Sequence, residues 1–411
     1  MEKSNRMNFA YGSRYYTILL NMVFVLYAFL LPLSKAFPVF TGPYIILLFW
    51  LLEGGFSLKF EKIKSSKAMQ FLLLFFFFSI LSLLWSDNVA EGRQLLRYYF
   101  AIVVVAVSLY TSMQEKFVKY ILYAFLLSMF ISEITSYGIY FGWWQMQGHT
   151  AADPTPFMHH TIYSVFLAVT IFLLISQVKD IRTPLFLRVF ELLFLLSSSV
   201  NLFINGGRTG QLALIFGALA YTFIYFKKKI YLLYTLLVLA AVFMSAYSLS
   251  TNFNHRVHQA VSDIQNIQKG NLQTSWGTRI AIKIVSSEII EDNILFGVGM
   301  GDSMDVYKEY LQKPKFSDFK FTKNVHHLHD QFIQILVQTG IIGFGLFLFF
   351  FYALFRIIFT STNDLIKASL FSILTVFIFS FFTDVPFKNF TAGLFAFVIG
   401  YFLNRTAVKN V

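Results

Sequence analysis

The chain has 411 residues, of which 57% are hydrophobic and only 13% are charged. A soluble domain carries about a quarter charged residues, and a disordered chain carries far fewer apolar ones, so both classes are excluded. The net charge of +12 does not call for a nucleic-acid partner, because membrane proteins collect Lys and Arg in their cytoplasmic loops. The sequence contains no cysteine, so it offers neither disulfides nor thiol chemistry.

Long apolar runs predict an all-α integral membrane protein, because a run of about 18 residues crosses a bilayer as a helix. We expect about twelve transmembrane helices, with one large, partly helical loop between the ninth and the tenth. The predicted spans are 16–33, 38–53, 68–85, 97–112, 118–144, 160–176, 184–204, 210–226, 230–249, 332–355, 365–382 and 389–404. The chain thus divides into nine spans within 1–249, a loop at 250–331, and three spans with a short tail within 332–411.

The basic residues between the spans predict the orientation. The connections on the side of both termini hold nineteen, namely Lys3, Arg6, Arg14, Lys59, Lys62, Lys64, Lys67, Lys116, Lys119, Lys179, Arg182, Arg188, Lys227, Lys228, Lys229, Arg356, Lys367, Arg405 and Lys409. The short connections on the other side hold five, which are Lys35, Arg93, Arg97, Arg208 and Lys388. Because positive loops stay in the cytoplasm, we expect both termini to be cytoplasmic and the long loop to face outward.

The long loop carries patterns of three amphipathic helices, at 255–269, 278–291 and 302–311. Such helices are suited to lying on a bilayer surface or capping a cavity between spans. A glycine-rich segment, Gly297 to Gly301, separates the second from the third. It follows no parallel strand and opens no dinucleotide-binding unit, so a tight turn is the favoured interpretation over a nucleotide site.

A histidine cluster, His326-His327-Leu328-His329-Asp330, directly precedes the apolar run that starts at Phe332. Three interpretations remain open from the residues alone: a metal site through His326 and His329, a polar interfacial segment, or a catalytic imidazole at the mouth of a membrane cavity. The third is favoured, because neutral histidine is the usual general base near pH 7.

Cations at the outward membrane edge are a second candidate feature, since charges kept there against the orientation rule often hold an anion. Arg208 lies in a glycine-rich turn, in which Gly206, Gly207 and Gly210 permit close backbone approach. Lys35 lies in the first outward turn and Asp384 in the last. For Lys35, snorkelling at a helix end is an equal alternative, and Asp384 has the alternative of an ordinary polar turn residue.

The order and spacing of these motifs resemble the O-antigen ligase and polymerase superfamily of bacterial inner-membrane enzymes. The motifs are Gly206-Gly207-Arg208-Thr209-Gly210, Gly277-Thr278-Arg279, Leu295 to Gly301, His329-Asp330-Gln331-Phe332, and Gln338-Thr339-Gly340-Ile341-Ile342-Gly343. The resemblance implies that Arg208 and Arg279 bind a diphosphate and that His329 is the catalytic residue. It also implies, more loosely, supporting roles for Lys35 and Asp384.

Asp330 departs from the Asn or Ser that usually follows the family's histidine. A carboxylate beside His329 would raise the pKa of that imidazole. His326 and His327 are expected to be replaceable.

The resemblance implies a glycosyltransferase with a lipid-diphosphate donor and no cofactor. We expect it to be metal-independent, because the outer loop has no Cys, no Asp-x-Asp triplet and no strong ligand set, and inverting, because a single displacement inverts the anomeric carbon. As an O-antigen ligase, it would move O-antigen polysaccharide from undecaprenyl diphosphate to the lipid A core, at the periplasmic face of the bacterial inner membrane. Its partners would be the lipid-linked donor, the lipid A-core acceptor and membrane lipids, with no nucleic acid.

Two alternatives stay open. An O-antigen polymerase would use the same donor, whereas the single long loop and the length favour a ligase. A transporter or flippase usually carries ionisable residues in mid-span and repeated halves. Here the mid-span charges are few, mainly Glu133 and Glu191, and no half repeats the other.

Overall fold

The computed structural model describes residues 2–179 and 183–407, with side chains for residues 14–179 and 183–406. Within these residues the fold is helical and contains no β-sheet; the one isolated backbone bridge joins Thr150 and Asp153. Arg182 and Lys409, which entered the count of basic residues, lie outside the described residues. The prediction of an all-α membrane protein is confirmed.

Sixteen α-helices follow one another along the described residues. They are α1 (Glu2–Leu30), α2 (Gly42–Glu53), α3 (Phe56–Ser65), α4 (Lys67–Leu81), α5 (Val89–Ser112), α6 (Glu115–Tyr140), α7 (His160–Val178), α8 (Leu185–Ile204), α9 (Arg208–Tyr225), α10 (Ile230–Leu249), α11 (Thr251–Gln268), α12 (Ser275–Asp292), α13 (Ser303–Tyr310), α14 (Gln331–Thr360), α15 (Asp364–Thr383) and α16 (Thr391–Ala407). Short π or 3₁₀ turns lie between them, at η1 (Phe37–Thr41), η2 (Ser82–Trp85), η3 (Pro314–Thr322) and η4 (Pro386–Lys388).

Each of the twelve predicted spans falls on a helix, but not every helix has the length of a full span. Eight described helices are long and apolar enough to cross a membrane, and a ninth is counted if α2 and α3 form one bent span. The bend between these two helices is 116°. It occurs at Gly54 and Gly55, which both have positive φ and so turn the chain sharply without steric cost.

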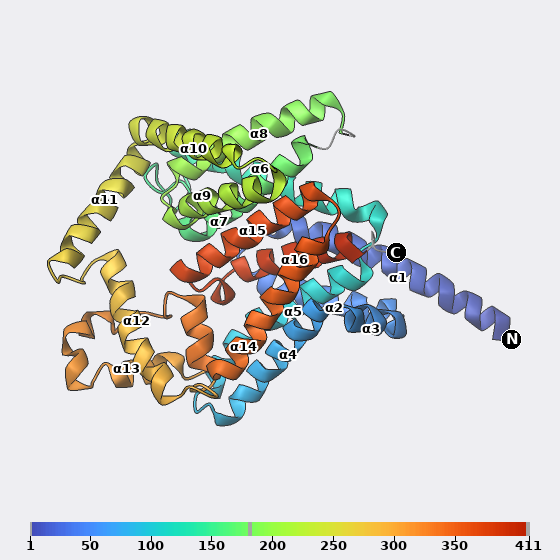
Figure 1. The fold of residues 1–411 in the computed structure, drawn as a ribbon. Helices are drawn as coiled ribbons and strands as arrows, with labels where there is room; N and C mark the ends of the chain where they lie inside the picture. Colours follow the sequence, from blue (N-terminus) through green and yellow to red (C-terminus); the bar gives the residue numbers. More distant parts are fainter. Residues whose placement is uncertain (1, 180–182, 408–411) are drawn as a thin grey trace.

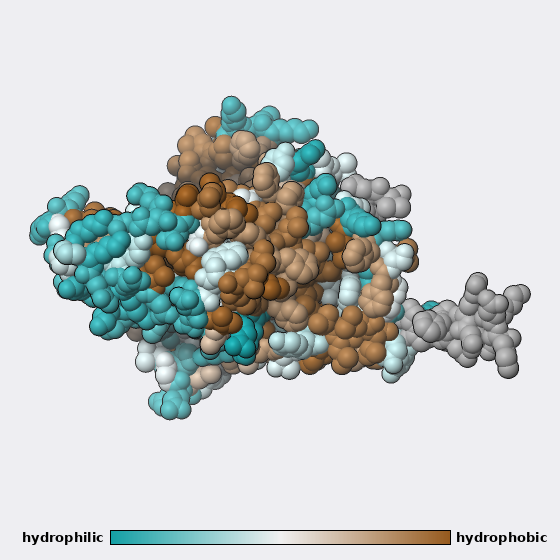
Figure 2. Space-filling view, turned by 90° about the horizontal axis from the view of Figure 1, so that it is seen from below, coloured by the Kyte–Doolittle hydropathy of each residue, from teal (hydrophilic) through white to brown (hydrophobic). Residues whose placement is uncertain are grey.

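The molecule has an apolar body and a polar end. Figure 1 shows the apolar helices packed side by side, with α11, α12 and α13 at one end and both chain termini directed away from them. Figure 2 shows a broad hydrophobic surface over the helical body, with hydrophilic residues gathered at the end that carries the long connection. An apolar belt between polar ends is the surface that a bilayer requires.

The three helices predicted in the long loop are confirmed as α11, α12 and α13. The apolar face of α12 is fully buried at Ile282, Val285 and Ile289, where it forms a separate small core with Tyr307 and Leu328. The long connection therefore has its own hydrophobic core and lies as a folded unit against the start of α14.

The glycine-rich segment from Gly297 to Gly301, before α13, packs directly against α14 at Gly340, and we call this contact the glycine joint. Val298 and Gly299 donate backbone hydrogen bonds to the carbonyls of Val337 (2.8 Å) and Gln338 (3.1 Å) in α14. A Cβ on Gly297 would lie 2.5 Å from the Val337 carbonyl, so only glycine permits this approach. On the α14 side, Gly340 has φ 58° and breaks the regular helix. The interpretation as a turn, and not a nucleotide site, agrees with this packing.

Candidate functional site

A cavity of about 700 Å³ opens at the polar end of the molecule. Its walls come from the start of α7, the turn before α9 and the first residues of α9, the helices α11 and α12, and the end of α15. The charged and imidazole side chains that line it are His160, Arg208, Arg256, Asp263, Arg279 and Lys283. The excess of cations makes the cavity suited to an anionic ligand.

Arg208 reaches this cavity because glycines allow the start of α9 to pack directly onto α7. A Cβ on Gly207 or Gly210 would lie within 2.4 Å of Ser164, and the Gly210 amide donates to the Ser164 hydroxyl at 3.0 Å. The Arg208 guanidinium donates to the Gln259 side-chain oxygen at 2.9 Å and lies 3.5 Å from an Asp263 carboxylate oxygen. The turn thus fixes a planar cation against α11.

Arg279 lies in the first turns of α12. The Thr274 side chain caps this helix by accepting a hydrogen bond from the Gly277 amide at 3.0 Å. The Arg279 guanidinium donates to the Thr383 carbonyl at 3.2 Å and to the Ser275 carbonyl at 3.0 Å. These backbone acceptors hold the side chain without neutralising its charge.

Arg208 and Arg279 lie 71 positions apart in the chain (279 − 208) and line the same cavity. Burial lowers the pKa of Arg279; the negative charge of Asp384 opposes this shift and the positive charge of Arg208 adds to it. The two cations are therefore near enough to act on one ligand. That this ligand is a diphosphate stays a prediction.

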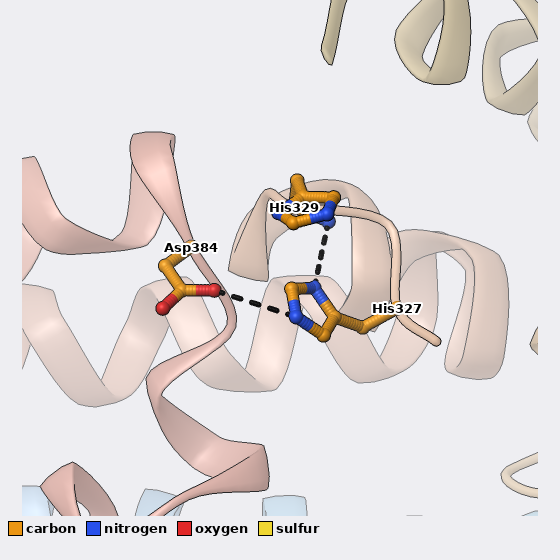
Figure 3. A group of neighbouring side chains, drawn as sticks. All are labelled: His327, His329 and Asp384. Carbon is orange, nitrogen blue, oxygen red and sulfur yellow. Dashed lines mark hydrogen bonds and ion pairs between the residues drawn. The ribbon is translucent and has the colours of Figure 1, made fainter. Parts of the chain in front are cut away.

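Beside Arg279, the side chains of His327, His329 and Asp384 form a compact group (Figure 3). The His327 Nε2 lies 3.7 Å from an Asp384 carboxylate oxygen, and its Nδ1 accepts a hydrogen bond from the His329 backbone N–H at 3.2 Å. The centroids of the two imidazole rings are 4.1 Å apart. The turn after α15, which carries Asp384, thus lies against the histidine cluster of the long connection.

His329 has an unusual backbone conformation. With φ 53°, it is the only non-glycine residue with positive φ among the described residues. Its neighbours hold it there: the Leu328 amide donates to the Gln334 side chain at 3.1 Å, and Asp330 caps α14 by accepting from Phe332 and Ile333. Backbone strain of this kind concentrates at functional sites, where the surrounding structure must enforce it.

The expectation that Asp330 raises the pKa of His329 is wrong. The Asp330 carboxylate points to Lys283, at 2.7 Å, and to the first amides of α14. Burial lowers the pKa of His329 to about 4; repulsion from His327, when that ring is protonated, and from Arg279 adds to this shift, against a smaller opposing effect of Asp384. His329 is therefore neutral near pH 7, and its buried Nδ1 has no hydrogen-bond partner among the described residues.

His327 is held in one tautomer. Burial, Lys388, Arg279 and His326 lower its pKa to about 4, so it is also neutral near pH 7. Because its Nδ1 accepts the His329 amide, its proton lies on Nε2, facing Asp384. The Nδ1 of His329 is thus left buried and without a hydrogen-bond partner among the described residues, while His327 holds the His329 backbone; neither ring is among the side chains that line the cavity.

The same three side chains have ligand atoms within 4.8 Å of one another, a spacing at which a metal ion could bind. The nearby cations oppose it: Arg279 and Lys388 both lower the pKa of His327 by repelling added positive charge. The set also differs from the sequence expectation, which paired His329 with His326. The His326 side chain is exposed, and its carbonyl accepts from Lys388 at 2.9 Å.

The two supporting residues named from the sequence have different positions. Asp384 lies within the histidine group and acts electrostatically on Arg279. Lys35 is exposed in the connection between α1 and η1 and is not among the residues that line the cavity.

Sequence reasoning overlooked three further side chains of the site. Arg256 and His160 line the cavity, and the His160 Nδ1 lies 3.3 Å from an Asp153 carboxylate oxygen. His327 was considered replaceable but contacts Asp384. The spacing His327-Leu328-His329 was visible, whereas Arg256 and His160 belong to no motif, and only the fold brings them to the cavity.

A known protein family matches part of the chain. The family model described as O-antigen ligase matches residues 192–348, which run from α8 into α14. This segment contains Arg208, Arg279 and His329, whereas Lys35 and Asp384 lie outside it. No curated protein matches the chain. The match confirms the resemblance to the O-antigen ligase and polymerase superfamily that the motifs indicated.

Proposed function

We propose that this chain is an O-antigen ligase, from the premise that residues 192–348 match the O-antigen ligase family model. In this proposal it transfers O-antigen polysaccharide from undecaprenyl diphosphate to the lipid A core. The reaction takes place at the periplasmic face of the bacterial inner membrane, with both termini of the enzyme in the cytoplasm.

The observation that carries the proposal is the convergence of Arg208 and Arg279 on one cavity, beside the neutral His329. A diphosphate leaving group gains negative charge as its bond to the sugar breaks. Guanidinium groups already fixed in a partly dry site stabilise that charge without reorganising. Removing a single donor of this kind costs about 3 kcal/mol of transition-state stabilisation in well-studied enzymes.

The proposed reaction is a single displacement. The acceptor hydroxyl oxygen forms a bond to the anomeric carbon, and the bond from that carbon to the diphosphate oxygen breaks, with its electron pair leaving on the diphosphate. The hydroxyl proton passes to the neutral imidazole of His329. One displacement inverts the anomeric centre, and the energy comes from the diphosphate linkage, so no nucleotide or other cofactor takes part.

A polymerase is the second candidate, since it uses the same donor and differs only in the acceptor. The single long connection between α10 and α14 favours the ligase. A transporter is less well supported, because the polar groups of the cavity collect at one end of the molecule. The mid-span carboxylate of Glu133 accepts a hydrogen bond from Ser198 at 2.7 Å and is thus satisfied locally.

A lipopolysaccharide gel from a strain that lacks this chain tests the function. We expect complete core without an O-antigen ladder, and recovery of the ladder when the chain is supplied again. A core that carries a single repeat unit would identify a polymerase instead. An unchanged ladder would contradict both readings.

Metal independence is tested with the purified protein. We expect glycan transfer to survive excess EDTA, because Arg208 and Arg279 supply the positive charge that a metal would otherwise provide. Loss of transfer with EDTA and recovery with a divalent ion would instead assign His327, His329 and Asp384 as metal ligands.

A further inference from the structure

We propose that Arg256 is a third ligand of the diphosphate, which shares one phosphate group with Arg208 while Arg279 binds the other. This inference rests on the proposed function and deepens it. It predicts that the cavity selects lipid diphosphates over lipid monophosphates, because the two phosphate groups meet separate sets of cations.

The position of Arg256 is set by the turn that carries Arg208. A Cβ on Gly206 would lie 2.6 Å from the Arg256 Nη2, so the guanidinium lies directly on this glycine. Arg256 also donates to the Gln259 side-chain oxygen at 3.0 Å, the same atom that accepts from Arg208 at 2.9 Å. One amide oxygen therefore holds both guanidinium groups side by side, and both line the cavity.

Arg279 belongs to a different wall. It is held by Ser275 and Thr383, at the meeting of α12 and the end of α15, whereas Arg208 and Arg256 lie at the meeting of α9 and α11. The cavity between these walls thus has two separate cationic positions. A diphosphate also has two negative positions, one on each phosphate group.

The cavity has more cations than close carboxylate partners, which favours the binding of an anion with two charged groups. Lys283 is paired with Asp330 at 2.7 Å, and Arg208 is partly compensated by Asp263 at 3.5 Å. Among the described residues, neither Arg256 nor Arg279 has a carboxylate within 4.0 Å; Asp153 and Asp384 act on them only from further away. Each wall therefore holds one cation without a close counter-ion.

Holding Arg256 in this place has an electrostatic cost. Burial lowers the pKa of its guanidinium, and the neighbouring positive charge of Arg208 lowers it further. Two arginines held together by one neutral amide repel each other in the absence of a ligand. An anion between them removes that repulsion and fits their planar, forked donors.

The experiment measures lipid binding to the full-length protein in detergent by native mass spectrometry. The probes are undecaprenyl diphosphate, undecaprenyl monophosphate and uncharged undecaprenol. The variants are Arg256→Gln and Arg208→Gln, with Arg93→Gln as the matched control. Arg93 is exposed on α5, outside the cavity, and its substitution makes the same change in net charge.

We expect the wild type to bind the diphosphate more tightly than the monophosphate. Arg256→Gln should weaken diphosphate binding about tenfold or more, as for the loss of a charge-assisted contact. It should weaken monophosphate binding less, because a monophosphate can still bind at Arg279. Arg93→Gln should bind like the wild type.

The outcomes separate the two proposals. If Arg208→Gln weakens diphosphate binding but Arg256→Gln does not, the role of Arg256 is refuted and the proposed function stands. If the wild type binds the diphosphate no better than undecaprenol, the proposed function fails as well. Should Arg256→Gln not fold, Arg256→Lys replaces it, and binding equal to the wild type would then overturn the inference, because Lys lacks the forked donor.

Discussion

The two imidazoles of the candidate site have different contacts. His327 uses Nδ1 to accept the His329 amide and turns Nε2 to Asp384, so both of its nitrogens are engaged. His329 keeps an unpartnered Nδ1 in a strained loop beside Arg279. In the proposed mechanism, the proton acceptor and the residue that positions it are therefore two places apart in the chain.

This division predicts a graded response to substitution. His329→Ala should lower the transfer rate by about 10²-fold or more, because the general base is lost while Arg208 and Arg279 still bind the donor. His327→Gln should lower it by about tenfold, since the loop loses its acceptor. His326→Ala should stay within about threefold of the wild type, because its side chain is exposed. Purified variants, compared at saturating donor, provide the measurement.

Full activity of a folded His329→Ala protein would contradict the assignment of the base. Loss of donor binding in that variant, with the chemistry otherwise intact, would make His329 a diphosphate ligand.

The pH dependence follows from the lowered pKa of His329. The imidazole is an effective base only when neutral, so activity is retained above its pKa and lost as the pH falls below it. We expect the acid limb of kcat/KM near pH 4, and not near the reference value of about 6.5. The bound diphosphate offsets the positive charge of Arg279, so the acid limb of kcat should lie at higher pH than that of kcat/KM. If the acid limbs of kcat and kcat/KM coincided near pH 6.5, the imidazole of His329 would not lie in a buried environment beside cations.

The degree to which single residues could be predicted depended on whether their partners are local. Arg208 and His329 lie in short motifs whose glycines or flanking residues are visible in the sequence. Asp384 lies 57 positions after His327 (384 − 327), so their contact depends on how α15 ends against α14. Arg256 has no motif at all, and its place depends on the packing of α11 against the turn at Gly206.

At the scale of elements, the glycine joint connects the long connection to α14. Gly340 has φ 58°, and a Cβ there would lie 2.3 Å from the Leu295 carbonyl. The backbone of α14 opens at this point, and Ile341 donates its amide to the Ile294 carbonyl at 2.8 Å. This joint sets the position of α12 and thus of Arg279.

We predict that Gly340→Ala destabilises the protein by about 2 kcal/mol or more, because it combines a strained φ with a backbone clash. Gly345→Ala is the matched control: it lies in the same helix, and a Cβ there meets no atom within 4 Å. Alanine favours a helix over glycine, so the control should melt at the wild-type temperature or slightly higher. Thermal unfolding in detergent compares the two, and equal melting temperatures would contradict the structural role of the joint.

Periodicity predicted the helices well and their connections poorly. The apolar face of α12 was visible because Ile282, Val285 and Ile289 recur at helical spacing. The 116° bend after α2 was not, since two glycines permit many turns and only the packing selects one. The spacing of Gly297 and Gly340 likewise indicates turns, but not that the two pack against each other.

At the scale of the whole molecule, the polar end and the chain termini lie on opposite sides of the apolar body. The count of basic residues assigns the side of the termini to the cytoplasm. With that predicted orientation, every side chain of the candidate site would face the periplasm, where we propose that lipid-linked glycans meet their acceptor.

Enzyme fusions test this orientation. Alkaline phosphatase inserted after Asn271, an exposed residue between α11 and α12, should be active because it would be exported. The same enzyme after Lys229, in the turn before α10, should be inactive. The reverse pattern would place the cavity in the cytoplasm and remove the basis of the proposed function.

The site draws on residues from position 160 in α7 to position 384 after α15, and this spread has a consequence for biosynthesis. Asp384 reaches its place only when α15 is inserted, and α16 then packs against α5, which was made nearly three hundred residues earlier. A nascent chain still attached to the ribosome thus exposes its arginines without the acidic partner of His327. Under the proposed function, we therefore expect the chain to become active only at the end of its own insertion, so that incomplete chains in the membrane do not consume the lipid-linked donor.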